Sequence, residues 1–367
     1  MSSTSIEITS FALSLAHPLE TARGTIDARE GFLVAVERNG VLGIGEASPL
    51  PGWTESHEAC TEALERARAE YDEERRRRDP RAALRAALET FDARETPAAR
   101  HGFAAAIADR RARQDGRALY RHLGGTEHVE HVAVNTTIGD GTPAEAASAA
   151  EDALDEGFQC LKVKVGARSI GADVARLRAI REVAPNAEIR ADANGAYSLA
   201  EARRALAAFE GTGDLAYVEQ PLSAADLAGH AVLRGESDLR IALDETLSER
   251  SISAVCNEGA ADVVICKPMV LGGLDRVRTA SLRARAAGIE PVVTTTIDGA
   301  IARAGSTHLA ASLAPIVPCG LATASLLEAD LVGENPAPVT GGYARVPQRP
   351  GTVEATTARA AIDRSRS

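Results

Sequence analysis

Residues 160–194 read CLKVKVGARSIGADVARLRAIREVAPNAEIRADAN. The first segment, 160–165, is a short apolar run that predicts a strand, and it carries two lysines two residues apart. The next segment, 170–183, is rich in Ala, Arg and Leu and predicts a helix. A second apolar segment, 187–190, then leads into an aspartate at position 192. Strand, helix and strand in this order indicate parallel strands that end in polar residues.

The same alternation continues in both directions from about residue 130. Short β-branched segments predict eight strands, at 132–134, 160–165, 187–190, 215–218, 240–243, 262–266, 291–295 and 315–317. Helices are expected between them, among others at 143–156, 170–183, 199–209, 274–287 and 300–314. Eight repeats of strand and helix are typical of a parallel (β/α)8 barrel, the TIM-barrel architecture.

The first hundred residues follow a different pattern. Three antiparallel strands are expected, at 6–14, 31–38 and 41–47, with Arg38-Asn39-Gly40 as a hairpin turn, followed by helices at about 56–76 and 81–91. We therefore predict an α/β protein in three parts. An N-terminal α+β capping domain covers residues 1–100, a barrel with the active site covers 101–325, and a tail at 326–367 returns to the cap.

Composition narrows the class of partner. The formal net charge is −11, so a nucleic acid is not an expected partner. The polar start MSSTSIEITS does not look like a secretory signal, and no apolar run is long enough to span a membrane. The five cysteines are scattered without CxxC pairs, as expected of buried thiols in a reducing cytoplasm. We expect a cytoplasmic protein acting on a small molecule; the sequence leaves the oligomeric state open, a homo-oligomer included.

Lysine is rare in this chain. Of 41 basic residues, only Lys162, Lys164 and Lys267 are lysine, and the rest are arginine. Arginine keeps its proton under ordinary conditions, whereas a buried lysine can lose one near neutral pH. The three lysines are therefore candidates for chemistry that arginine cannot perform. Chance retention under a compositional bias is the alternative, and it would place them on exposed helices.

Acidic residues end three consecutive predicted strands. Asp192 ends the third strand, Glu219 the fourth and Asp244 the fifth, while Lys162 and Lys164 lie on the second and Lys267 ends the sixth. In a barrel these ends form the active-site face. Three carboxylates there repel one another unless a cation is present, and an all-oxygen set favours Mg²⁺, with Mn²⁺ as an alternative. The other interpretation is that each acid pairs with an arginine.

The lysines flank the expected carboxylates on both sides. A substrate carboxylate bound to the metal would lie between two ammonium groups. This arrangement suits removal of a proton α to a carboxylate, because the metal offsets the charge of the enediolate and a lysine accepts the proton. A neighbouring ammonium and the metal are both expected to lower the pKa of such a lysine.

These motifs together resemble the enolase superfamily, and within it the muconate-lactonising branch. The matching motifs are Lys162-Val-Lys164, Asp192-Ala-Asn194, Val218-Glu219-Gln-Pro, Leu243-Asp244-Glu-Thr and Ile265-Cys-Lys267-Pro. The resemblance implies that the three acids bind Mg²⁺, that Lys164 is the general base, that Lys267 is the opposite member of the pair, and that Lys162 tunes its neighbour. Arg190, Asn194 and Glu245 are expected to support these residues.

The capping segment is expected to contact the substrate. Residues 45–53, GEASPLPGW, resemble the cap-loop motif of o-succinylbenzoate synthases, and Trp53 offers an apolar face to a ring. The alternative is that Trp53 is a core residue of the cap. Arg23, in a second cap loop at about 17–24, is a candidate for binding a distal carboxylate. Thr294, Thr295 and Gly320, near the last strand ends, are further substrate-binding candidates.

The resemblance implies a dehydration. The expected reaction converts 2-succinyl-6-hydroxy-2,4-cyclohexadiene-1-carboxylate into 2-succinylbenzoate, a step of menaquinone synthesis. Ala322 stands where these synthases carry an acid, and the Asp-x-Asp pair of dipeptide epimerases is absent from this region. Muconate cycloisomerase, N-acylamino acid racemase and dipeptide epimerase remain alternative activities of the same branch. A non-catalytic metal-binding or partner-binding barrel is the remaining interpretation, and it would have no use for paired lysines.

Overall fold

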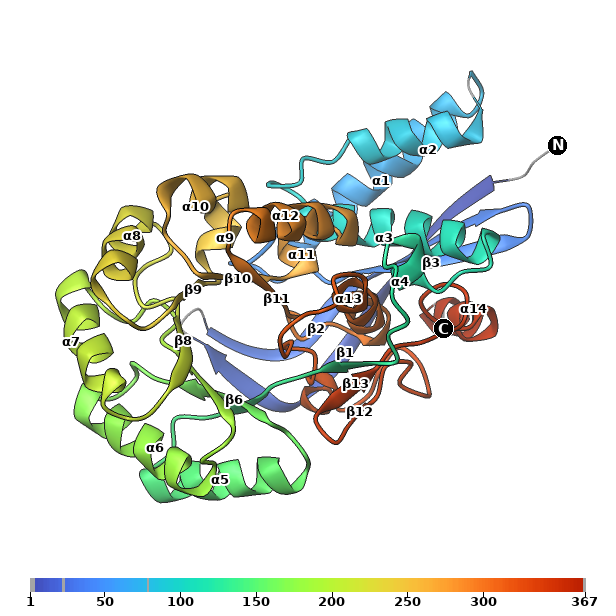
Figure 1. Cartoon of the computed structure of the whole chain (residues 1–367). Helices are drawn as coiled ribbons and strands as arrows, with labels where there is room; N and C mark the ends of the chain where they lie inside the picture. The colour runs from blue at the N-terminus through green and yellow to red at the C-terminus, as the bar shows by residue number, and fades with distance from the viewer. Residues whose placement is uncertain (1–3, 22–23, 78, 366–367) are drawn as a thin grey trace.

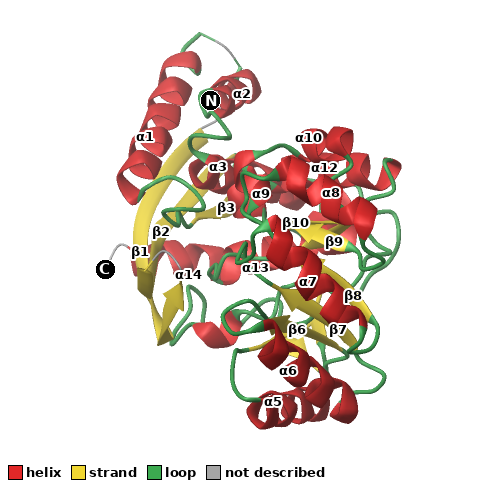
Figure 2. Ribbon diagram, turned by 90° about the vertical axis from the view of Figure 1, so that its left-hand side faces the viewer, coloured by secondary structure: helices red, strands yellow, loops and turns green. Residues whose placement is uncertain are grey.

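The computed structural model describes residues 4–21, 24–77 and 79–365, and the chain forms two parts. A curled parallel sheet surrounded by helices makes up one part, and an antiparallel sheet with its own helices makes up the other (Figure 1). In the second view, the helices α1 and α2 project from the antiparallel sheet, away from the parallel strands (Figure 2). Within the described ranges, no helix is both long and apolar enough to cross a membrane.

The N-terminal sheet has three antiparallel strands in the order β1-β2-β3. They span Thr4–Thr21, Gly24–Arg38 and Val41–Ala47. The predicted strands are confirmed, although the first two are longer than expected. Asn39 and Gly40 form the turn between β2 and β3 with φ angles of 54° and 75°. Two consecutive positive φ angles are what a tight hairpin turn requires, and Asn-Gly adopts them readily.

Three helices that follow β3 in the chain pack on one face of this sheet. The two predicted ones are α1 (His57–Glu74) and α2 (Pro80–Glu89), and the Ser56 hydroxyl caps the N-terminus of α1. A third helix, α3 (Pro97–Gln114), was not predicted, and it packs on β3. Close packing there depends on glycine, because a Cβ at Gly45 would lie 2.0 Å from the Gly102 carbonyl oxygen.

The parallel sheet has seven strands in the order β11-β10-β9-β8-β7-β6-β5. From β5 to β11 they span Thr136–Ile138, Cys160–Lys164, Glu188–Asp192, Leu215–Glu219, Ile241–Leu243, Val263–Cys266 and Glu290–Val293. The main intervening helices are α5 (Pro143–Asp155), α6 (Ile170–Val183), α7 (Leu199–Glu210), α8 (Leu227–Glu236), α10 (Ile252–Glu258), α12 (Leu274–Ala286) and α13 (Ala300–Ser312). Short helices are α4 (Leu119–His122), α9 (Thr246–Glu249) and α11 (Pro268–Leu271). The predicted strands two to seven and the named helices are therefore present.

The predicted first strand was wrong in its position. Residues His131–Ala133 form β4, which pairs antiparallel with β13 (Tyr343–Arg345) in a separate small sheet with β12 (Val339–Thr340). The first parallel strand is β5, a few residues later. The partner of β4 comes from the C-terminal tail, so local apolar character alone could not reveal this pairing.

The predicted eighth strand at 315–317 is not a strand in the described structure, so the sheet has seven regular parallel strands instead of eight. Prolines at 315 and 318 lack the N–H group that a ladder needs. The chain instead makes two isolated parallel bridges just beyond, Val134 to Cys319 and Thr294 to Gly320. These bridges lie between the two edges of the curled sheet.

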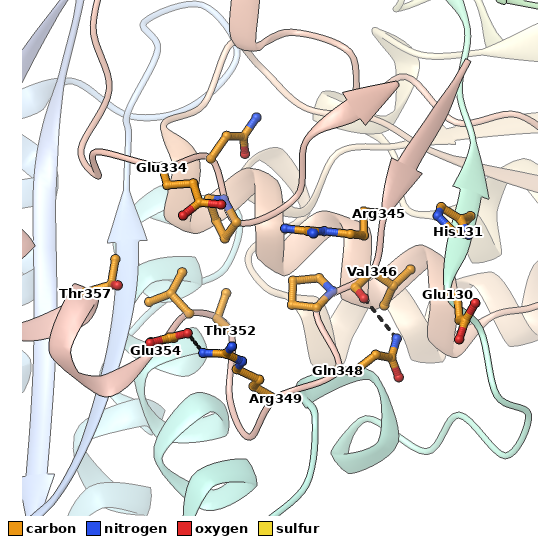
Figure 3. Close-up of a pocket in the computed structure, with 14 residues that line it drawn as sticks. Glu130, His131, Glu334, Arg345, Val346, Gln348, Arg349, Thr352, Glu354 and Thr357 are labelled. Carbon is orange, nitrogen blue, oxygen red and sulfur yellow. Dashed lines mark hydrogen bonds and ion pairs between the residues drawn. The ribbon is translucent and has the colours of Figure 1, made fainter. Parts of the chain in front are cut away.

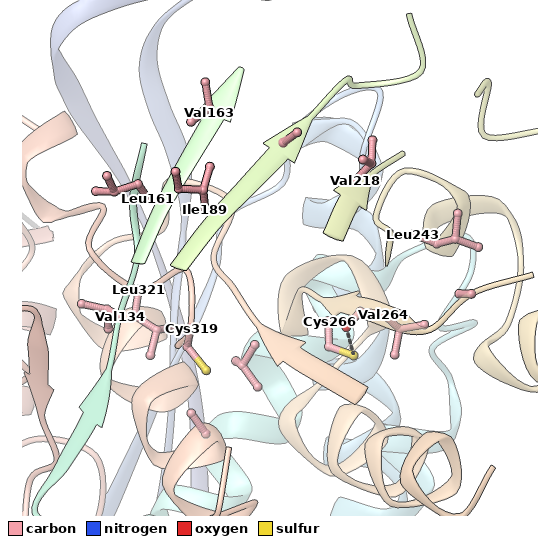
Figure 4. Close-up of a cluster of buried hydrophobic side chains, with 14 of the residues drawn as sticks. Val134, Leu161, Val163, Ile189, Val218, Leu243, Val264, Cys266, Cys319 and Leu321 are labelled. Atoms are coloured by element: carbon pink, nitrogen blue, oxygen red, sulfur yellow. Dashed lines mark hydrogen bonds between the residues drawn. The ribbon is translucent and has the colours of Figure 1, made fainter. Parts of the chain in front are cut away.

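The packing of the parallel strands follows the two-residue alternation of side chains. One set of side chains, including Leu161, Val163, Ile189, Val218 and Leu243, belongs to the large core cluster (Figure 4). The alternate positions on the same strands carry lysines and carboxylates towards the strand ends. The hydrophobic core thus fixes the register that presents the polar residues together.

The C-terminal tail packs on the N-terminal sheet. Its last helix, α14, spans Ala355–Ser365. Ala358, Ala361 and Ile362 of this helix share a hydrophobic cluster with Leu33 and Ile44 of β2 and β3. A short 3₁₀ turn, η1 (Ala324–Leu326), contacts β1 on the way. The tail therefore connects the end of the parallel sheet to the N-terminal sheet.

Candidate active site

The register of three neighbouring strands places polar side chains side by side. Lys164 of β6 pairs with Asp192 of β7, and Asp192 pairs with Glu219 of β8. Asp244 follows the last residue of β9 directly, and Lys267 follows the last residue of β10. All lie at the carboxyl ends of parallel strands, where open α/β sheets and barrels carry their sites.

The lysines form ion pairs with the carboxylates. Lys162 Nζ lies 2.7 Å from Glu219 Oε1 and 3.0 Å from Asp192 Oδ2, so it bridges two strands. Lys164 Nζ lies 2.7 Å from the same Asp192 oxygen. Lys267 Nζ donates to Asp244 Oδ2 at 2.5 Å. The chain's three lysines therefore all contact the predicted carboxylates at strand ends, and none lies on an exposed helix as the alternative would place it.

Burial and charge set the protonation of these groups. Burial alone would raise the pKa of Asp192, but the ammonium groups of Lys162 and Lys164 hold this pKa below its ordinary range. Burial and the charge of Asp192 raise the pKa of Glu219 to about 7. Burial would lower the pKa of Lys162, yet the charges of Asp192 and Glu219 raise it well above its ordinary value. Lys162 is thus a fixed cation between two carboxylates.

Asp244 and Lys267 form the other side of the group. Burial is the largest influence on Asp244 and raises its pKa, against the opposing charge of Lys267. The ammonium group of Lys267 also lies over the ring of Trp53, 3.6 Å from the ring centroid. Trp53 is half-buried and comes from the loop after β3. The structure thus brings the predicted cap residue to a predicted barrel lysine.

The carboxylates retain oxygens that fit a metal. Glu219 Oε2, Asp244 Oδ1 and Glu245 Oε2 are buried and have no hydrogen-bond partner among the described residues. An unpartnered buried polar atom is costly, so such atoms usually have a ligand or ion to satisfy them. Carboxylate oxygens are the donors that Mg²⁺ prefers. The donor set therefore fits a hard divalent cation.

The arrangement is not that of a closed metal site. Across residues 4–21, 24–77 and 79–365, no three His, Cys, Asp or Glu side chains are gathered so as to hold a metal ion. Lys162 lies between Asp192 and Glu219, and Lys267 faces Asp244. The ammonium groups supply the positive charge there. Convergence of the three acids on one ion stays a prediction, which the unpartnered oxygens support.

Of the three residues expected to support the site, Asn194 and Glu245 are connected to Lys164 by hydrogen bonds. Asn194 accepts a hydrogen bond from Lys164 Nζ at 2.7 Å and donates from Nδ2 to Glu245 Oε1 at 2.9 Å. Asn194 has a φ of 45°, a conformation that Asn tolerates better than most residues. Asn194 and Glu245 therefore form a chain that leads from Lys164 towards the start of α9.

Arg190 lies elsewhere, two residues before the end of β7. Its Nε donates to Glu188 at 2.7 Å and its Nη1 donates to the Pro318 carbonyl at 2.8 Å. The guanidinium stacks over Tyr217 at 5.0 Å from the ring centroid. Arg190 thus contacts the segment that bridges the sheet edges, and within the described structure it forms no hydrogen bond or ion pair with the three acids.

A cavity of about 290 Å³ opens beside Lys162 and Glu219. Thr294 and Gly320 line it, and the Thr294 hydroxyl donates to the Gly320 carbonyl at 2.9 Å. Thr295 does not line the cavity, but its hydroxyl lies 2.9 Å from the hydroxyl of Thr323, which does. The structure therefore places Thr294 and Gly320 on the cavity wall and Thr295 in contact with a wall residue. Arg23 lies outside the described residues.

Several cavity residues were not predicted. They are Asn135, Thr136, Thr137, Tyr217, Ile265, Val292, Thr323, Ser325 and Leu326, and Ala322 also lines the cavity. Tyr217 could have been found, since it lies two residues before Glu219 and therefore faces the same side of β8. Thr137 was missed because the first parallel strand was placed too early. A second cavity, of about 580 Å³, lies at the tail near Arg345, Glu334 and Glu354 and contains none of the predicted site residues (Figure 3).

Comparison with known proteins adds to this geometry. Residues 4–124 match the family model described as mandelate racemase / muconate lactonizing enzyme, N-terminal domain, and residues 145–353 match the enolase C-terminal domain-like model. The chain is 29% identical to the L-Ala-D/L-Glu epimerase of Bacillus subtilis over 94% of each chain. The solved substrate-liganded structure of that epimerase has a TM-score of 0.82, with 28% identity over 95% of this chain and 97% of that one.

Two further relatives carry different names. The chain is 30% identical to the aromatic dipeptide epimerase of Herpetosiphon aurantiacus, over 82% of this chain and 83% of the relative. It is 36% identical to the o-succinylbenzoate synthase of Mycobacterium tuberculosis, over 62% of this chain and 68% of the relative. Similarity to the epimerases therefore extends further along the chain, whereas identity to the synthase is higher within a shorter stretch.

Proposed function

Since this chain belongs to the mandelate racemase/muconate lactonizing enzyme family of the enolase superfamily, we propose that it is a Mg²⁺-dependent enzyme that removes the proton α to a substrate carboxylate. One observation carries this proposal. All three lysines of the chain contact carboxylates at the ends of neighbouring parallel strands. Structural ion pairs would be made equally well by arginine, which the chain uses almost everywhere else.

Asp192, Glu219 and Asp244 would hold the ion. The unpartnered oxygens on Glu219 and Asp244 support this assignment. When bound, Mg²⁺ would neutralise the clustered acids, offset the negative charge that develops on the substrate carboxylate and weaken the hold of the nearby lysines on their protons. Mn²⁺ offers similar ligand chemistry and is expected to replace it.

The lysines then have separate tasks. Lys164 accepts the α-proton on Nζ, and Asn194 orients this amine through the hydrogen bond at 2.7 Å. Lys267 approaches from the other side of the carboxylates and stabilises the negative charge on the substrate. Lys162, held between Asp192 and Glu219, keeps its proton and places a fixed positive charge beside Lys164.

The specific reaction we propose is the dehydration catalysed by o-succinylbenzoate synthases, a carbon–oxygen lyase reaction. The C–H bond α to the carboxylate breaks, the proton moves to Lys164, and the same proton leaves with the departing hydroxide as water. The new double bond makes the ring aromatic, which supplies driving force. The 36% identity to the Mycobacterium tuberculosis synthase and the placement of Trp53 over Lys267 support this choice.

The composition of the cavity also supports a substrate without an ammonium group. Among the described residues that line the cavity, Glu219 is the single acidic residue and Lys162 the single basic residue. Glu219 is assigned to the metal, so no acid remains in the lining to pair with a substrate cation. Ala322 also lies on this wall, where o-succinylbenzoate synthases carry an acid, so this position departs from the synthase motif.

Epimerisation or racemisation is the second candidate, and the length of the match to the Bacillus subtilis epimerase favours it. Lys164 and Lys267 come from different strands, β6 and β10, and pair with different acids. One lysine could remove a proton from one face of a carbon while the other returns a proton to the opposite face. Muconate cycloisomerisation would use the same residues on a different substrate.

Two assays on the purified protein with Mg²⁺ separate these activities. The first measures formation of 2-succinylbenzoate by its absorbance, and the second measures incorporation of solvent deuterium at the α-carbon of dipeptides and N-acylamino acids. We expect turnover in the first assay that is lost in Lys164→Ala. Deuterium incorporation without dehydration would assign the racemase or epimerase activity instead. Failure of both assays, with the wild type equal to Lys164→Ala, would contradict the proposed chemistry.

A further inference from the structure

A strained turn follows β11 near the cavity. Ile297 has a φ of 60°, and a β-branched residue in this left-handed region is a genuine conformational outlier. Such strain persists only where surrounding contacts impose it. The turn comes two residues after Thr295 and three after Thr294, which contact the cavity segment 320–323. Contacts that hold Ile297 in place are therefore expected to fix Thr294 and Thr295 as well, and with them one wall of the cavity.

Arg29 of β2 holds this turn. Its side chain is 2% exposed, and its Nε donates to the Ile297 carbonyl at 3.2 Å. The other two guanidinium nitrogens donate to the Ser48 carbonyl at 2.8 Å and the Pro49 carbonyl at 3.0 Å. One rigid, planar group thus joins the turn after β11 to the loop after β3.

The loop after β3 leads directly to Trp53. Thr54 closes this loop by donating its backbone N–H to the Leu50 carbonyl, and Trp53 donates to the same carbonyl at 2.9 Å. The position of residues 48–50 therefore determines where the indole lies. Arg29 contacts the loop at its first two residues, so it connects the backbone that leads to Trp53 to the turn after β11.

Glu46 joins the same two segments. Its Oε1 accepts from the Gly299 N–H and from the Ser48 hydroxyl, both at 2.6 Å, and its Oε2 accepts from the Ala302 N–H at 2.9 Å. Glu46 therefore joins the N-terminus of α13 to the start of the loop after β3. Arg29 differs, because its three bonds all go to backbone carbonyls of the loop and the turn. Burial of the Arg29 charge is costly, and the nearby charges of Asp298 and Glu46 offset part of this cost.

We propose that Arg29 is a positioning residue, which holds Trp53 over Lys267 by joining the cap loop to the strained turn at Ile297. Arg29 does not touch the reacting atoms and acts through Trp53. The effect on turnover rests on the proposed function, whereas the effect on Trp53 does not. A guanidinium is needed because a lysine ammonium cannot reach three carbonyls in one plane.

The chain's single tryptophan provides the test. Its fluorescence emission and its quenching by acrylamide are measured in the full-length wild type and in Arg29→Met and Arg29→Lys. Lys267→Met shows what the signal becomes without the ammonium. Arg110→Met is the matched control, because Arg110 is also 2% exposed in the capping part and bonds to Gln114 within its own helix.

We expect Arg29→Met to shift the emission to the red and to increase quenching, Arg29→Lys to do so partly, and Arg110→Met to match the wild type. We also expect KM to rise by about tenfold to a hundredfold with a smaller change in kcat. If Arg29→Met does not fold, Arg29→Lys is judged by the same criteria. A wild-type Trp53 signal in a folded Arg29 variant overturns the proposal. A shifted signal without turnover in any assay leaves this proposal standing and contradicts the proposed function.

Discussion

The ammonium group of Lys267 lies between the Trp53 ring, 3.6 Å from its centroid, and Asp244 Oδ2 at 2.5 Å. The tryptophan comes from the loop after β3 and the lysine from the end of β10, so this contact joins the capping part to the parallel sheet. The cation is attracted both by the face of the indole and by the carboxylate. One contact thereby connects the predicted substrate-binding residue of the cap to the predicted site residues of the parallel sheet.

Replacing Trp53 should lower kcat/KM without abolishing activity. A cation–π contact contributes about 0.5–2 kcal/mol, so kcat/KM of Trp53→Ala is expected to fall by roughly twofold to thirtyfold. Trp53→Phe keeps an aromatic face and should lose less. Steady-state kinetics on the three proteins measures this. If Trp53→Ala matches the wild type, the indole has no part in the site and is a core residue of the cap.

Lys164 should be irreplaceable even by another cation. Arg keeps the ion pair with Asp192 but does not give up its proton, so Lys164→Arg and Lys164→Met are both expected to lose activity by about 10²–10⁴-fold. Thermal unfolding checks that both variants fold. Arg168→Lys, on the exposed loop after β6, is the control and should retain activity. Substantial turnover by Lys164→Arg would refute the role of Lys164 as a base.

Glu46 should make stability depend on pH. Burial and the charge of Asp298 raise the pKa of Glu46 to about 7. Between about pH 4.5 and pH 7 the folded state therefore binds more protons at this site than the unfolded state. The free energy of unfolding should decrease as pH rises through this window, by on the order of 3 kcal/mol from Glu46.

Urea unfolding of the wild type and of Glu46→Gln at several pH values measures this contribution. The glutamine variant should show a shallower decrease of stability between pH 5 and pH 7, whatever its absolute stability. Glu30→Gln removes an exposed carboxyl from β2 and should keep the wild-type slope. An unchanged slope in Glu46→Gln would show that Glu46 is ionised throughout this range.

Gly320 should not accept a side chain. A Cβ there would lie 2.2 Å from Thr294 Oγ1 and 2.9 Å from Thr294 Cβ. Gly320→Ala is therefore expected to cost about 1–3 kcal/mol of stability and to disturb the cavity wall. Adding Thr294→Ala removes the hydroxyl in the way and should restore part of the loss. Gly333→Ala, where a Cβ has no neighbour within 4 Å, should be neutral. Equal stability of Gly320→Ala and wild type would contradict the close packing.

Much of the fold could be predicted because each parallel strand has a local signal. The segments ending at Lys164, Asp192 and Glu219 are apolar runs that finish in charged residues, and the structure places them as strands. The edges of the sheet could not be predicted in the same way. β4 pairs with β13 from the tail, and the last segment contributes bridges at Cys319 and Gly320 instead of a strand. Those pairings depend on partners far away in the sequence.

The clustering of the candidate residues was expected from residue type and alternation. Two lysines two residues apart face the same side of a strand, and in the structure Lys162 and Lys164 both contact Asp192. The family resemblance drawn from these motifs is confirmed by the matching family models. Arg29 and Ile297 could not be found from the sequence. Arginine is abundant in the chain, and a positive φ at an isoleucine has no sequence signal.

Electron paramagnetic resonance can count the Mn²⁺ ions bound to the protein and so show whether the three strand-end acids form one divalent-ion site. We expect one Mn²⁺ per chain, displaced by Mg²⁺. Binding should be weaker by more than about tenfold in Glu219→Gln and in Asp244→Asn. Glu290→Gln, which removes an exposed ion pair with Arg240 at the start of β11, should bind as the wild type does. No bound Mn²⁺ in the wild type, or equal binding in all four proteins, would show that these acids do not form a divalent-ion site.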